Sequence, residues 1–178
     1  MTIFLSGGAK NGKSALAQDL AVRLSGNGPR YYVATMIPVD EEDRQRVRNH
    51  VADRRGLGFR TIECGRNILS CLNDADRNGT FLLDSVTALL MNEMFTETGI
   101  DRGAGERCAE ELASFARSVK NVVIVSDAIY SDAAQYDEIT ELYRASLARA
   151  DHALAQACEM VIEMVAGQPI LFKGELPK

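Results

Sequence analysis

The residues with the clearest chemical potential lie close to the start of the chain. Residues 7–14 match the phosphate-binding pattern G-x-x-x-x-G-K-[ST]. Its glycines let backbone N–H groups turn toward phosphate oxygens, at a helix N-terminus that already favours anions. Lys13 would reach the β- and γ-phosphates, and the Ser14 hydroxyl would bind Mg²⁺. We therefore predict a nucleoside triphosphate site, the P-loop, formed by Gly7, Gly8, Ala9, Lys10, Asn11, Gly12, Lys13 and Ser14.

The segments on either side of the P-loop support this prediction. A short apolar strand, Ile3-Phe4-Leu5, precedes it, and a good helix-forming stretch over 13–24 follows it. The alternative is a glycine turn that contains Gly-Lys-Ser by chance. A strand, a glycine loop and a helix in this order are the context in which the pattern binds phosphate, so we favour the functional interpretation.

Asp84 is a second candidate because it ends the continuous apolar run Phe81-Leu82-Leu83. In P-loop proteins, an acid at the end of such a strand commonly holds Mg²⁺. Asp84 and Ser85 also precede a predicted helix, so Asp84 could instead be its N-cap. From the residues alone, both roles stay open. We favour the metal role, in which Ser14 and Asp84 form the magnesium site.

The chain contains two histidines, His50 and His152. His50 lies on a predicted helix that opens with four acids, and helical spacing places Arg46 and Arg54 on its face. An imidazole between two arginines could meet phosphate, but a solvated or capping histidine would show the same spacing. His152 lies among alanines of a long predicted helix and is expected to be structural or exposed.

Composition limits the class of protein. The chain has 178 residues, of which 46% are hydrophobic, so a single domain over residues 1–178 is expected. Its net charge of −5 argues against nucleic acid as a partner.

The chain has no apolar run that could span a membrane, and a strand that leads directly into the P-loop is no signal peptide, so we expect a cytoplasmic protein. Its four cysteines lack zinc-site spacing and are expected to be reduced thiols.

Strands and helices are predicted to alternate along the chain. The predicted strands are 2–6, 30–35, 59–63, 80–84 and 121–126, followed by a hairpin of 160–165 and 169–173. Helices are predicted over 13–24, from 40 to the glycine at 56, and over 67–74, 85–95, 105–120 and 134–157, with a loop over 98–105. This order predicts an α/β fold of the P-loop NTPase type, RecA-like. Its sheet would be mostly parallel, with flanking helices and an antiparallel C-terminal edge.

Beyond these local patterns, the chain resembles the adenosylcobinamide kinase/adenosylcobinamide-phosphate guanylyltransferase family of cobalamin biosynthesis. Residues 7–14 resemble its G-G-A-R-S-G-K-S loop, and 32–35 resemble its Y-I-A-T strand end. Residues 40–50 match D-x-E-M-x-x-R-I-x-x-H, with Asp43 in place of methionine. Residues 83–87 and Asn92 resemble L-V-D-C-L-T and the asparagine beyond it, and the tail from Tyr143 keeps the family's register. The resemblance covers nearly the whole chain.

The resemblance implies an enzyme with two steps. ATP or GTP phosphorylates the aminopropanol hydroxyl of adenosylcobinamide, and the adenosylcobinamide phosphate then takes GMP from a histidine that GTP has guanylylated. The histidine in this sequence is His50, and a neutral imidazole is a competent nucleophile near pH 7. The resemblance adds Thr35, Arg46 and Glu63 to the expected nucleotide contacts. It further implies Mg²⁺ and a homo-oligomer, such as a trimer, with shared active sites.

Two segments depart from the family pattern. The family shows S-N-E-V-G where this chain has residues 126–130, so the glutamate is replaced by Ala128 and the glycine by Tyr130. Within residues 145–152, four residues of the family pattern are replaced in this chain: an acid, a glycine, an asparagine and a glutamine. Two alternatives therefore stay open: a regulatory or pseudoenzyme paralogue that binds nucleotide and lacks the kinase step, or a P-loop kinase for another small metabolite.

Overall fold

A seven-stranded sheet forms the centre of the protein, in a computed structural model that describes residues 1–175. The order across the sheet is β3-β2-β4-β7-β1-β8-β9. All neighbouring strands are parallel except β8 and β9, which pair antiparallel at the edge. The predicted mostly parallel sheet with an antiparallel C-terminal edge is therefore confirmed. The strands are β1 (Thr2–Gly7), β2 (Arg30–Ala34), β3 (Phe59–Glu63), β4 (Thr80–Asp84), β7 (Asn121–Val125), β8 (Met160–Val165) and β9 (Gln168–Lys173).

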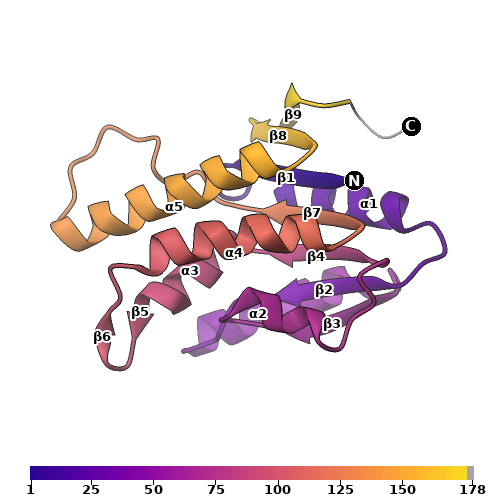
Figure 1. Cartoon of the computed structure of the whole chain (residues 1–178), viewed down its shortest axis with the longest axis horizontal. Coiled ribbons are helices and arrows are strands. Elements are labelled where there is room, and N and C mark those ends of the chain that lie inside the picture. Colours follow the sequence, from indigo (N-terminus) through magenta and orange to yellow (C-terminus); the bar gives the residue numbers. More distant parts are fainter. Residues whose placement is uncertain (176–178) are drawn as a thin grey trace.

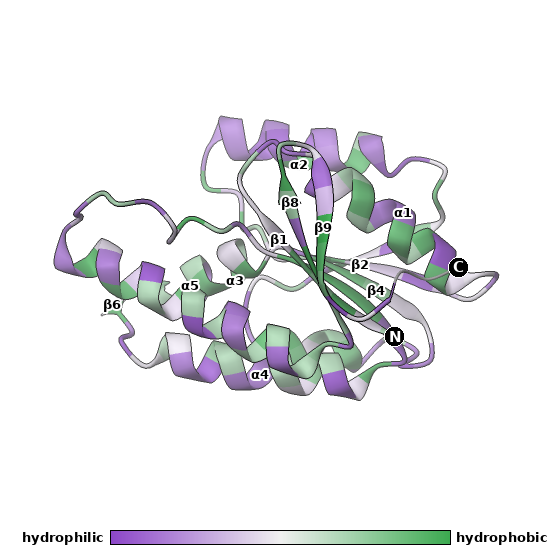
Figure 2. Ribbon diagram, turned by 90° about the horizontal axis from the view of Figure 1, so that it is seen from above, coloured by the Kyte–Doolittle hydropathy of each residue, from purple (hydrophilic) through white to green (hydrophobic). Residues whose placement is uncertain are grey.

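Helices cover both faces of this sheet (Figure 1). Seen from above, α1 and α2 lie on one side of the strands, while α3, α4 and α5 lie on the other (Figure 2). The three-layer arrangement places the carboxyl ends of the parallel strands along one edge, where α/β proteins build their ligand sites. The helices are α1 (Lys13–Ser25), α2 (Glu41–Asp53), α3 (Val86–Met94), α4 (Ala104–Ser118) and α5 (Glu138–Ala157).

The apolar core is divided in two by the sheet. Successive residues of a strand point to opposite faces, so Phe81 and Leu83 pack toward α3, α4 and α5, while Leu82 packs toward α1. All three of these side chains are at most 1% exposed. Burial on both faces explains why β4 and β7 are continuous apolar runs rather than alternating ones.

Three predicted elements differ from the structure. Helix α5 begins at Glu138 rather than at Ala134, because Asp137 caps it by accepting a hydrogen bond from the Thr140 amide at 2.8 Å. The helix predicted over 67–74 is a short 3₁₀ turn, Ile68–Leu72. The loop predicted over 98–105 contains one strand of a small hairpin formed by β5 (Phe95–Thr96) and β6 (Gly99–Ile100).

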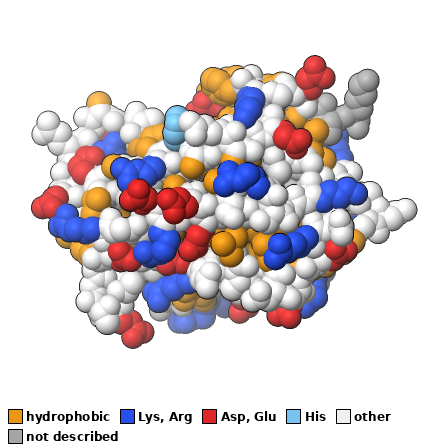
Figure 3. Space-filling view, viewed as in Figure 1, with side chains coloured by type: hydrophobic (Ala, Val, Ile, Leu, Met, Phe, Trp, Pro, Cys, Tyr) orange, Lys and Arg blue, Asp and Glu red, His pale blue; other side chains and the backbone are white. Residues whose placement is uncertain are grey.

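The surface mixes both signs of charge. On the face that carries α4 and α5, basic and acidic side chains alternate (Figure 3). Within residues 1–175, no helix has the length and apolar character to cross a membrane. The four cysteines are free thiols and all are buried, as expected.

Candidate functional site

The P-loop connects β1 to α1 in the conformation that its glycines permit. Gly7 has φ +142° and Gly12 has φ +89°, values that other residues rarely adopt. A Cβ atom added at Gly7 would lie 2.6 Å from the carbonyl oxygen of Met164, so β8 also requires a glycine here. The Asn11 side chain donates to the same carbonyl at 2.6 Å. The loop is thus fixed against β8 before any nucleotide binds.

Lys13 is held at the mouth of this loop. Its side chain is only 6% exposed, and Nζ donates to the Gly8 carbonyl at 2.5 Å. Nζ also forms an ion pair with Asp127 Oδ1 at 2.8 Å. Asp127 follows β7, and the next residue, Ala128, donates its amide to the Gly7 carbonyl at 3.1 Å. The carboxyl end of β7 therefore runs directly beside the P-loop.

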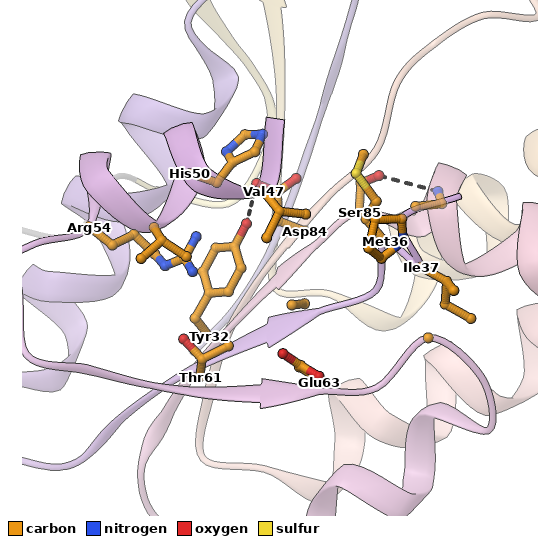
Figure 4. A pocket seen from close by; sticks show the side chains of 15 residues that line it. Tyr32, Met36, Ile37, Val47, His50, Arg54, Thr61, Glu63, Asp84 and Ser85 are labelled. Carbon is orange, nitrogen blue, oxygen red and sulfur yellow. Dashed lines mark hydrogen bonds between the residues drawn. The ribbon is translucent and has the colours of Figure 1, made fainter. Parts of the chain in front are cut away.

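A pocket of about 320 Å³ lies at the same edge of the sheet, between α2 and the ends of β2, β3 and β4. Val47 and His50 line it from α2, Arg54 lines it directly after α2, and Glu63 and Asp84 line it from the strand ends. Figure 4 shows His50 above Asp84 in this pocket. His50 is half-buried, and its Nδ1 atom is buried without a hydrogen-bond partner among residues 1–175. Buried polar atoms without a partner are uncommon in folded proteins, and the place of this one at the wall of a pocket suits a ligand-binding role.

Asp84 faces His50 and is not the helix cap. Its Oδ2 atom accepts a hydrogen bond from the Tyr32 hydroxyl at 3.0 Å (Figure 4). Ser85 caps α3 instead, since its hydroxyl accepts from the Ala88 amide at 3.3 Å. Burial raises the pKa of the Asp84 carboxyl, while His50 and the Tyr32 hydrogen bond act in the opposite direction. The capping alternative is therefore wrong for Asp84, and the carboxylate is available to the site.

Arg54 forms the floor of the pocket together with Tyr32. Its guanidinium carbon lies 3.4 Å from the centroid of the Tyr32 ring, and the residue is 7% exposed. Nη1 of Arg54 is buried without a partner within residues 1–175. Burial and the Asp84 charge raise the pKa of the Tyr32 hydroxyl, so it stays protonated and donates to Asp84. The pocket thus presents a positive charge on the same side as the histidine.

The remaining residues expected at the site lie in different environments. Thr35 is fully buried, and its hydroxyl bonds both the amide and the carbonyl of Ser85, at 2.7 and 2.8 Å. Glu63 lines the pocket. Arg46 points away from it and forms exposed ion pairs with Glu42 and Asp43. His50, Glu63 and Asp84 therefore line the same pocket. The Thr35 hydroxyl is bonded to the Ser85 backbone, and Arg46 does not line the pocket.

The residues at this edge fit a magnesium ion. Ser14 supplies a hydroxyl at the start of α1 and Asp84 supplies a carboxylate at the end of β4. Oxygen atoms of this kind are the ligands that Mg²⁺ prefers, with phosphates and water completing its shell. Among the described residues, no three His, Cys, Asp or Glu side chains form a cluster that could hold a metal by themselves. A metal that arrives with the nucleotide agrees with this arrangement.

Three residues that the structure places at the site were not among the predicted site residues. Asp127 carries the same signal that identified Asp84, an acid after a buried apolar strand, and could have been found by it. Arg54 lies four residues after His50, so helical spacing placed it on the right face without showing that it is buried. Tyr32 gave no signal, because its hydroxyl reaches Asp84 through the pairing of β2 with β4.

Nearly the whole chain is similar to a known family of proteins. The family model described as "Cobinamide kinase / cobinamide phosphate guanyltransferase" matches residues 3–172. The chain is 27% identical to the bifunctional adenosylcobalamin biosynthesis protein CobU of Salmonella typhimurium, over 97% of this chain and 100% of that protein. It is 31% identical to the bifunctional adenosylcobalamin biosynthesis protein CobP of Pseudomonas aeruginosa, over 98% of this chain and 99% of that protein.

Solved structures resemble the chain in fold. One of them, an ATPase domain, superimposes with a TM-score of 0.52 at 10% identity, over 97% of this chain and 76% of that one. A KaiC-like protein from Pyrococcus horikoshii OT3 gives a TM-score of 0.51 at 12% identity, over 91% and 69% of the two chains. These likenesses show the predicted RecA-like P-loop fold.

Proposed function

Because the chain belongs to the cobinamide kinase/cobinamide phosphate guanyltransferase family, we propose that it is a transferase of adenosylcobalamin biosynthesis that carries GMP on His50. The observation that supports this most directly is the imidazole of His50, whose Nδ1 atom has no hydrogen-bond partner among residues 1–175 and which faces Asp84. A neutral imidazole is a competent nucleophile near pH 7, so a histidine at the wall of this pocket can serve as a covalent carrier.

In the guanylyl-transfer half, an imidazole nitrogen of His50 attacks the α-phosphorus of GTP. A nitrogen–phosphorus bond forms, the bond to the bridging oxygen breaks, and pyrophosphate leaves with its electron pair. The imidazole gains positive charge as this bond forms, and the nearby Asp84 carboxylate stabilises that charge. Arg54 supplies a guanidinium on the same pocket wall, which suits a phosphate better than the outward-pointing Arg46 does.

In the kinase half, the P-loop binds ATP or GTP and transfers the γ-phosphoryl group to the hydroxyl of adenosylcobinamide. Backbone amides of the loop and Lys13 hold the phosphates. Ser14 and Asp84 would hold Mg²⁺, which neutralises charge on the transferred group. A cytoplasmic location and a homo-oligomer, such as a trimer, are parts of this proposal that rest on the family alone.

Covalent guanylylation can be tested directly. The protein is incubated with α-labelled GTP and Mg²⁺ and then separated under denaturing conditions. We expect acid-labile, base-stable label on the wild type and none on His50→Ala. His152→Ala is the matched control, because His152 is exposed on α5 and bonds only Gln156 among the described residues; it should label as the wild type does. Absence of label on the wild type at saturating GTP would refute the histidine carrier.

A nucleotide-binding paralogue without the kinase step is the second candidate. Tyr130 stands where the family has glycine and Asp151 where it has asparagine, and the Tyr130 hydroxyl donates to Asp151 at 2.8 Å. The two replaced residues therefore bond to each other between the end of β7 and α5. A wild type that accepts label on His50 but does not phosphorylate adenosylcobinamide with ATP or GTP would establish this candidate instead.

A further inference from the structure

The ion pair between Lys13 and Asp127 has no role in the chemistry described so far. We propose that Asp127 is the catalytic base of the phosphoryl-transfer step, which takes the proton from the acceptor hydroxyl. The proposal rests on the kinase half of the proposed function and deepens it. It also accounts for the glutamate that this chain lacks at Ala128, since a carboxylate is present one residue earlier.

The backbone fixes where the Asp127 side chain points. The amides of Ser126 and Ala128 donate to the carbonyls of Leu5 and Gly7, at 3.0 and 3.1 Å. This i, i+2 pattern continues the ladder between β7 and β1, so Asp127 projects to the opposite face from its two neighbours. Its own amide donates to the Thr87 hydroxyl at 3.1 Å, which holds the residue from the α3 side.

The ion pair sets the distance from Asp127 to the reacting phosphate. Lys13 Nζ lies 2.8 Å from Asp127 Oδ1, and the same ammonium group would contact the γ-phosphate of a bound nucleotide. Because a charge-assisted hydrogen bond to phosphate spans about 2.8 Å, the carboxylate lies within about 6 Å of a γ-phosphate oxygen. A hydroxyl between the two groups would be in hydrogen-bond reach of the base and in attacking distance of the phosphorus.

The Asp127 side chain is accessible enough for this role. Its side chain is 32% exposed, whereas Lys13 is 6% exposed, so an acceptor can approach Asp127 from solvent. A carboxylate this close to a triphosphate repels the substrate while it is charged. When Asp127 acts as a base, the proton that it takes up removes this negative charge.

The step balances in protons and bonds. The acceptor oxygen forms a bond to the γ-phosphorus as its proton passes to the Asp127 carboxylate. The bond from the γ-phosphorus to the β,γ-bridging oxygen breaks, and the nucleoside diphosphate leaves with that electron pair. Asp127 then returns its proton to water. The transfer of GMP from GTP to His50 involves no acceptor hydroxyl, so Asp127 is not needed there.

The test measures nucleotide binding and catalysis separately in Asp127→Asn. Asparagine keeps the size of the side chain and an oxygen that accepts from Lys13. We expect kcat for phosphorylation of adenosylcobinamide by ATP to fall about 100-fold or more, the range in which general-base groups act. The Kd for ATP should stay equal or become smaller, because a negative charge beside the phosphates is lost. Label from GTP on His50 should persist, which also shows that the variant is folded.

Two controls complete the experiment. Asp19→Asn removes an acid of the same type from an exposed i,i+4 pair with Arg23 on α1, and it should leave both kcat and Kd unchanged. Asp127→Glu keeps a carboxylate and should recover part of kcat. If Asp127 only restrains Lys13 in the empty site, Asp127→Asn will bind ATP more tightly without loss of kcat, and that result overturns the proposal. A wild type without phosphoryl transfer would instead refute the kinase half itself, and the base with it.

Discussion

Replacement of the buried Asp151 by asparagine should stabilise the protein at neutral and alkaline pH. Asp151 lies on α5 and is 3% exposed. Oδ2 accepts the Tyr130 hydroxyl at 2.8 Å, while Oδ1 is buried without a partner among residues 1–175. Burial raises the pKa of this carboxyl from 3.8 to about 6, although the nearby hydroxyl groups of Ser126 and Tyr130 oppose the rise.

The pKa shift gives the direction and the size of the effect. A carboxyl whose pKa is higher in the folded state stabilises that state fully below about pH 4, and the contribution is lost as pH rises through about 6. A shift of about two units corresponds to about 3 kcal/mol of unfolding free energy. Asparagine cannot ionise and still accepts the Tyr130 hydroxyl. Asp151→Asn should therefore be up to about 3 kcal/mol more stable than the wild type at pH 8.

Urea unfolding at pH 4 and pH 8 measures this difference. The wild type should lose stability relative to Asp151→Asn between the two pH values, with equal m-values for both proteins. Asp19→Asn, which removes an exposed carboxylate of α1, serves as the control and should show little pH-dependent gain. If the stability difference between Asp151→Asn and the wild type is the same at both pH values, the carboxyl does not titrate as its burial requires, and the reasoning is refuted.

Three further substitutions probe the site. Arg54→Lys loses the stacking on Tyr32 and should lower the unfolding free energy by about 1 kcal/mol, measured by chemical denaturation, and raise KM for GTP. Tyr32→Phe removes a hydrogen bond that lowers the pKa of Asp84, so the acid limb of the pH profile for His50 labelling should move to higher pH. Gly7→Ala brings a Cβ within 2.6 Å of the Met164 carbonyl, and calorimetry should show a loss of about 2 kcal/mol or more.

Local signals were sufficient for the sheet and for the P-loop. Continuous apolar runs marked β4 and β7, and the glycine pattern marked the loop, because both depend on residues close in sequence. Two features place the start of α5 later than predicted: the local cap at Asp137 and contacts from Arg144. Arg144 donates to the carbonyls of Tyr130, Asp132 and Ala134, which holds the segment before Asp137 out of a helix. A contact across ten or more residues overrides local helix propensity.

The pocket depends on strand pairing that sequence patterns do not contain. β2 lies beside β4 with Ala34 opposite Asp84, so Tyr32, two residues earlier on the same face, reaches the Asp84 carboxylate. His50 joins them only because α2 lies over this end of the sheet. The resemblance to the family identified His50, but the partnership of Tyr32, Arg54 and Asp84 required the three-dimensional arrangement.

The position of Asp84 would allow one edge of the sheet to serve both transfer reactions of the proposed function. β4 lies between β2, which borders the His50 pocket, and β7, which leads to Asp127 and Lys13. Asp84 is close enough to both His50 and Asp127 for their charges to shift its pKa, downward for His50 and upward for Asp127. A magnesium ion held at Asp84 would therefore serve a nucleotide whose γ-phosphate is at the P-loop and one whose α-phosphate is at His50. If both halves of the proposed function use this carboxylate, a nucleotide bound for one reaction would exclude a nucleotide bound for the other.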